Sequence, residues 1–164
     1  MDEQLPLPAG KSGPVKKALG QCSTNYQTSI YNTPLAKRMV KGHTHYLEFR
    51  VRPSPVIPTG HMYVVYGELD AAAKPRSYNY IGLFPKGWVA GLYAGIVAPV
   101  SLPADLEPSL LDCKTNPDAA YRVSLSDAQY KTLTTRVASI RNNPPKWKMI
   151  EYNCNHFAAS LGEI

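Results

Sequence analysis

Cys154 lies near the end of the sequence, where a short helix is expected to begin. Asn153 is a good N-cap residue, and the residues that follow have an apolar face made of Phe157, Ala158 and Leu161. As the first residue of that helix, Cys154 has its sulfur beside unpaired backbone N–H groups and the positive end of the helix dipole, which both favour the thiolate. The sequence therefore predicts a nucleophilic cysteine with a lowered pKa.

A nucleophilic cysteine also needs a base, and the sequence contains four histidines. His156 is close in sequence, but residues two apart on a helix point about 200° apart, so its ring is expected to face away from the sulfur. His61 follows Gly60 at the start of the apolar run HMYVVYGEL, where a side chain would lie at the rim of a sheet. We therefore expect His61 to be the base, with a purely structural role as the alternative for each histidine.

Two blocks of the sequence carry a resemblance to known enzymes. Residues Asn153 to Phe157 resemble the N-C-E-H-F motif around the nucleophile of the lecithin:retinol acyltransferase family, and are similar to the N-C-N segment of the PPPDE peptidases. Both are circularly permuted papain-like proteins related to the NlpC cell-wall peptidases, in which a histidine strand precedes the cysteine helix. Residues Gly60 to Glu68 resemble that strand. The resemblance implies a permuted papain-like fold with Cys154 as nucleophile and His61 as base.

Two positions depart from the acyltransferase pattern. Asn155 stands where that family has Glu, and Ala73 stands where it has a second histidine. A third catalytic group would then come from elsewhere, with Glu48, Asn79 and Asn155 as candidates. A Cys-His dyad and a domain without catalysis are the alternatives.

Three segments are predicted to form strands. Strict alternation over residues 44–52 predicts a half-buried strand, with Leu47 and Phe49 on one face and Glu48 and Arg50 on the other. Residues 61–69 and 78–84 are apolar and rich in β-branched and aromatic side chains, and they are expected to pair as an antiparallel hairpin. If that hairpin folds near residue 73, Leu83 and Phe84 face His61.

The helices come last. Ser126 and Gln129 form an S-x-x-Q capping box, an apolar stripe follows it, and Asn143-Pro144-Pro145 ends the pattern. Strands precede helices without βαβ alternation, which indicates an α+β fold with an antiparallel sheet packed against helices. The length of 164 residues suits one domain. We expect a flexible or draped arm over residues 1–25 and a single permuted papain-like domain over residues 26–164.

Composition restricts the partners. The formal net charge is +6, but the lysines and arginines are scattered, so nucleic-acid binding is not expected. No run reaches the 18 apolar residues of a transmembrane helix, and the longest candidate is Trp88 to Val100, so membrane insertion is not expected. His43 and His45 lack a second ligand pair, so no metal and no cofactor are expected. The three cysteines leave open whether Cys22 and Cys113 pair, and the oligomeric state is open as well.

The chemistry implied by the resemblance is acyl transfer through a Cys154 acyl intermediate, with hydrolysis of an amide as the main expectation. A small basic domain suits an anionic polymer, so peptidoglycan or another peptide is the expected substrate, in a secreted or cell-envelope setting. A lipid or protein acyltransferase or thioesterase on the same fold is one alternative. A binding or scaffolding domain without catalysis is the other.

Overall fold

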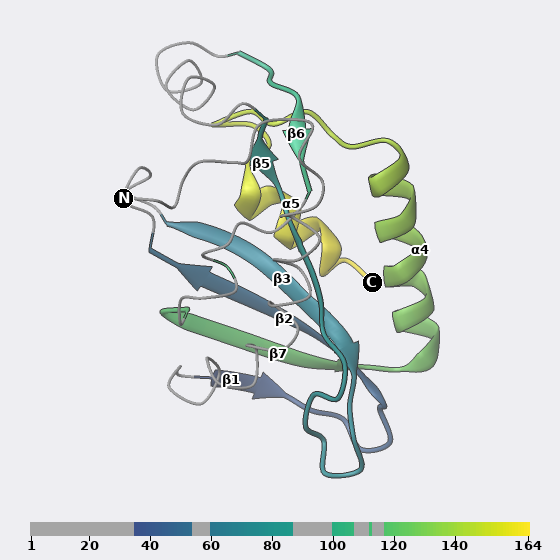
Figure 1. Ribbon diagram of the computed structural model, residues 1–164. Helices are drawn as coiled ribbons and strands as arrows, with labels where there is room; N and C mark the ends of the chain where they lie inside the picture. The colour runs from purple at the N-terminus through teal and green to yellow at the C-terminus, as the bar shows by residue number, and fades with distance from the viewer. Residues whose placement is uncertain (1–34, 54–59, 87–99, 107–111, 113–116) are drawn as a thin grey trace, which may run out of the picture.

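A mostly antiparallel sheet forms the centre of the protein (Figure 1). The computed structural model describes residues 35–53, 60–86, 100–106, 112 and 117–164. Within these residues the sheet has five strands in the order β1-β7-β2-β3-β4. Their bounds are β1 Leu35–Arg38, β2 His45–Arg52, β3 His61–Glu68, β4 Asn79–Gly82 and β7 Ala119–Leu125. The pair β1–β7 is parallel and the other neighbours are antiparallel.

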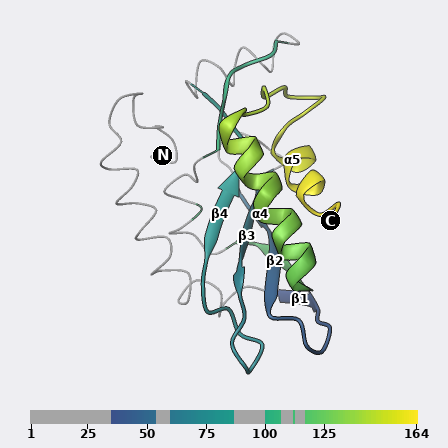
Figure 2. The same cartoon turned by 90° about the vertical axis from the view of Figure 1, so that its right-hand side faces the viewer.

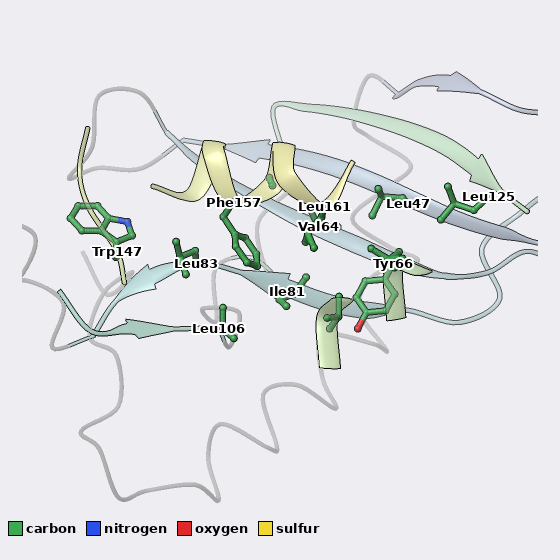
Figure 3. Packing of buried hydrophobic residues seen from close by; sticks show 13 residues of the cluster. Leu47, Val64, Tyr66, Ile81, Leu83, Leu106, Leu125, Trp147, Phe157 and Leu161 are labelled. Atoms are coloured by element: carbon green, nitrogen blue, oxygen red, sulfur yellow. The ribbon is translucent and has the colours of Figure 1, made fainter. Parts of the chain in front are cut away.

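Two helices pack on one face of this sheet, as Figures 1 and 2 show. They are α4 (Asp127–Asn142) and α5 (Cys154–Leu161). Figure 3 shows the apolar core between them and the sheet, where Phe157 and Leu161 of α5 lie over Val64 of β3 and Ile81 of β4. A small second sheet pairs β5 (Phe84–Pro85) with β6 (Ala104–Asp105). The layers are therefore helices on one face of a sheet, which confirms the α+β class.

The local signals for both helices are confirmed. The Ser126 side chain accepts from the Gln129 N–H and the Gln129 side chain accepts from the Ser126 N–H, which completes the predicted capping box. Helix α4 ends at Asn142, with Asn143 as its C-cap and the two prolines next in the chain. Helix α5 begins at Cys154 with Asn153 as its N-cap, as the sequence predicts.

The predicted strands are confirmed as β2, β3 and β4, and β3 and β4 form the expected antiparallel hairpin. Its register places Phe84 beside His61, with the two ring centroids 4.4 Å apart. Strands β7 and β1 were not predicted, and their parallel pairing departs from a purely antiparallel sheet. The predicted arm over residues 1–25, the apolar stretch of residues 88–99, Cys22 and Cys113 lie outside the described residues.

The prediction that β2 is half-buried is wrong. Its polar face is buried more completely than its apolar face: Glu48 and Arg50 have no exposed surface, whereas Phe49 is only partly buried. The Arg50 Nε donates to one Glu48 oxygen at 2.7 Å, and the Arg122 Nε donates to the other at 2.7 Å. Alternation identifies two faces of a strand, but it does not tell whether the polar face meets water or other buried charges.

We predict that Glu48→Gln destabilises the fold by about 3–5 kcal/mol, because it removes the carboxylate that two buried guanidinium groups share. Urea unfolding monitored by circular dichroism measures this change, with Glu68→Gln as the matched control. Glu68 is an exposed carboxylate on β3, and its loss is expected to cost less than about 1 kcal/mol. Equal effects of the two substitutions would contradict a structural role for the buried charges.

Candidate active site

Asn153 and the turn before it hold the head of α5. The Asn153 Oδ1 accepts the backbone N–H of Asn155 at 2.9 Å and that of His156 at 3.4 Å. Its Nδ2 donates to the Met149 carbonyl at 2.7 Å, which ties the cap to the preceding turn. These bonds satisfy N–H groups that a helix leaves without partners at its start. They place Cys154 in a defined position at the end of the helix.

Cys154 is buried, with 7% of its surface exposed. Its thiol donates to the Asn155 Oδ1 at 3.7 Å. Burial raises the pKa of Cys154 above its ordinary value, although hydrogen bonds from the backbone N–H groups of Met62, Asn155 and Cys154 itself lower it. The predicted lowering of this pKa is therefore wrong in its net direction, because loss of water around the sulfur outweighs the N–H groups. At neutral pH the group is a thiol.

His61 is also buried and uncharged at neutral pH. Burial lowers the pKa of His61 from 6.5 to about 4, against an opposing effect of the Asp112 carboxylate, and Arg52 lowers it further. Its Nε2 is buried, has no hydrogen-bond partner among the described residues, and lies 3.8 Å from the Asp112 Oδ2. That separation exceeds a hydrogen bond, so the contact is electrostatic.

The register of β3 decides on which face of the sheet the His61 side chain lies. His61 lies opposite Arg52 and shares its face of the sheet with Tyr63. Met62 is on the other face and packs against the core under α5. The Cys154 sulfur nevertheless lies beside the Met62 N–H, next to His61 in the chain. Cys154 and His61 thus lie at the same end of β3, with the imidazole on the face of the sheet opposite α5.

Asp112 is the carboxylate beside His61, and the sequence did not identify it. The three predicted candidates for a third group have other contacts: Glu48 binds Arg50 and Arg122, Asn79 donates to the Tyr66 carbonyl, and Asn155 accepts from the Cys154 thiol. Asp112 falls in a proline-rich stretch without periodicity, so no local pattern marks it. Its position emerges from contacts with residues that are distant in the sequence, such as Arg52, which is 60 residues away.

The other histidines have local contacts of their own. No group of three or more His, Cys, Asp or Glu side chains in the described part of the chain is arranged to hold a metal ion. His43 contacts the Ser124 Oγ, His45 stacks on the Tyr130 ring, and His156 contacts the Asn153 Oδ1.

Comparisons of the chain with protein-family models, with curated proteins and with solved structures found no match. Among the described residues, no helix combines the length and apolar character needed to cross a membrane. The site must therefore be interpreted from its own geometry and from the two motifs.

We predict that burial of neutral His61 makes the fold less stable in mild acid. The unfolded chain takes up a proton near pH 6.5 and the folded chain only near pH 4, so stability is lost as pH falls between these values. The loss is expected to reach about 3 kcal/mol. Urea unfolding at pH 7 and pH 4.5 measures it, and His61→Gln should remove that part of the pH dependence. An identical pH dependence in both proteins would show that His61 is not buried in its neutral form.

Proposed function

We propose that this protein is a cysteine-dependent amide hydrolase, with Cys154 as nucleophile and His61 as general base. The observation that supports this most is the position of the head of α5, which carries Cys154, at the end of β3, where His61 begins the strand. This order of histidine strand and cysteine helix agrees with a permuted papain-like arrangement. The two motifs that resemble the lecithin:retinol acyltransferase and PPPDE proteins lie on those two elements.

The proposed reaction proceeds through an acyl-enzyme. His61 takes the thiol proton while the Cys154 sulfur attacks the carbonyl carbon, and the carbonyl oxygen gains negative charge. In the proposed reaction the backbone N–H of Cys154, at the head of α5, donates to that oxyanion. As the C–N bond breaks, His61 returns the proton to the leaving amine. Water then attacks the thioester, and the products are a carboxylic acid, an amine and the free thiol.

The pKa directions imply that the resting site is a neutral pair. His61, with a pKa of about 4, is in its basic form at neutral pH, and Cys154 is protonated. The proton therefore moves during the attack, because no thiolate is formed beforehand. Such a site reacts slowly with ordinary thiol reagents and more quickly when a bound substrate brings its carbonyl to the sulfur.

Peptide amides, including those of peptidoglycan, are the proposed substrates. Transfer of a lipid or protein acyl group, or hydrolysis of a thioester, would use the same acyl-enzyme with a different acceptor. One observation favours a binding domain without catalysis. The imidazole of His61 and helix α5 lie on opposite faces of the sheet, and a binding domain does not need Cys154 and His61 to react together.

We predict that neutral His61 assists alkylation of Cys154. In a Cys22→Ser/Cys113→Ser background, the rate of reaction with iodoacetamide should stay above the rate expected from the thiolate alone between about pH 5 and pH 9. His61→Gln should remove this plateau and leave only the rise at alkaline pH. Mass spectrometry of the modified protein measures both rates.

His156→Gln is the matched control, because His156 is close to Cys154 in the chain but bonds to the helix cap. Its pH profile should remain that of the parent. If His61→Gln and the parent give the same profile, Cys154 and His61 are not coupled and the binding domain is the better interpretation.

We predict that the protein cleaves peptide amides in soluble peptidoglycan fragments and that Cys154→Ala abolishes this cleavage, since no other side chain replaces the nucleophile. Liquid chromatography with mass spectrometry detects the two fragments. Transfer of an acyl group to an added amine, without hydrolysis, would assign the transferase instead. If Cys154→Ala retains the cleavage, the proposed nucleophile is wrong.

A further inference from the structure

We infer that Asp112 is a positioning residue for His61: its carboxylate, anchored by Arg52, faces the imidazole and stabilises the cation that forms when His61 takes a proton. The role of that cation in catalysis rests on the function proposed above. The placement of Asp112 beside His61 rests on contacts of its own, and it can be tested without a substrate.

Asp112 is held at both its side chain and its backbone. Its side chain has no exposed surface, and the Arg52 Nε donates to its Oδ1 at 2.5 Å. The Tyr63 hydroxyl donates to the Asp112 backbone carbonyl at 3.1 Å. Arg52 lies directly opposite His61 in the β2–β3 register. The sheet thereby sets the position of the carboxylate relative to the imidazole.

The second carboxylate oxygen is directed to His61. Oδ2 lies 3.8 Å from Nε2, a nitrogen that is buried and has no hydrogen-bond partner among the described residues. The Phe84 ring, 4.4 Å away between centroids, and the Tyr63 ring restrict the imidazole. A proton on His61 would place a full positive charge beside a carboxylate in a buried site, where the attraction is stronger than in bulk water. Asp112 thus acts on the protonated form more than on the neutral one.

The charged groups that face His61 have opposite effects. Asp112 raises the pKa of His61, and Arg52 on β2 lowers it. Two further ionisable groups are near: burial raises the pKa of Tyr63 on β3 to about 12, and burial raises the pKa of Cys154 on α5, so both are neutral at neutral pH. Changes at residues 52 and 112 should therefore move the titration of His61 in opposite directions.

The experiment is an NMR titration of the His61 ring in the full chain between pH 7.5 and pH 3.5. The midpoint of the parent is expected near pH 4. Arg52→Gln should raise the midpoint by about one pH unit or more, because it removes a like charge and leaves Asp112 as the facing ion. Asp112→Asn should lower the midpoint, so that His61 remains neutral at the acid end of the range.

If Asp112 and Arg52 only maintained the fold, the His61 midpoint would respond differently. Substitutions that loosen the site let water reach His61, and both would then move its midpoint upward toward the ordinary value of about 6.5. A rise in Asp112→Asn, or no change, therefore overturns the inference. Glu68→Gln, an exposed carboxylate at the far end of β3, should leave the midpoint unchanged. The resonances of the other histidines serve as internal references.

Asp112→Asn leaves Arg52 buried without its carboxylate and is at risk of unfolding. In that event the double variant Arg52→Gln/Asp112→Asn, which has no net charge at the pair, is compared with Arg52→Gln alone. Its midpoint should be lower than that of Arg52→Gln. An equal midpoint overturns the inference.

The same variants separate this inference from the proposed function. If Asp112→Asn lowers the His61 midpoint but His61→Gln does not change Cys154 alkylation, Asp112 positions His61 and the hydrolase is rejected. If His61→Gln removes the alkylation plateau but Asp112→Asn leaves the His61 midpoint unchanged, the hydrolase stands and the inference about Asp112 is rejected.

Discussion

The carboxylate of Glu48 is enclosed between the guanidinium groups of Arg50 and Arg122, and the centre of the sheet depends on these two buried ion pairs. Glu48 and Arg122 are opposite each other in the β2–β7 register. A shift of the pairing by one residue would turn these charges toward the apolar core under the helices, at a large cost in desolvation. The buried charges thus specify one alignment of the central strands. Charges that favour a single register also determine where the ends of those strands lie.

The end of β2 and the start of β3 are where this alignment matters for the candidate site. With the register set, Arg52 stands opposite His61 and can hold Asp112 beside it. Loss of water is then the strongest influence on both ionisable groups of the proposed pair. It keeps the imidazole unprotonated and the thiol protonated. The helix head favours a thiolate at Cys154, yet the net pKa rises, because the same packing that positions the sulfur also removes its solvent.

The sequence was informative wherever structure depends on neighbouring residues. The Ser126 capping box, the Asn153 cap and the prolines after α4 each act within a few residues, so both helices were predicted with their correct starts. Alternation predicted β2, and apolar runs predicted the hairpin of β3 and β4. Strand β7 was not predicted, and its place between β2 and β1, both of which are far from it in the chain, is known only from the structure.

By itself, the sequence determined two helices, three strands and the α+β class, and it suggested Cys154 and His61 as a candidate pair. The tertiary structure alone decided that the polar face of β2 is buried, that Asp112 lies beside His61, and that the imidazole and α5 occupy opposite faces of the sheet. The physical reason is the separation along the chain of the residues that interact. Helix caps and alternation depend on residues that are close together in the chain. Burial and electrostatic environment depend on residues that meet only when distant strands pair. Burial and the neighbouring charges in turn set the protonation state of a thiol or an imidazole.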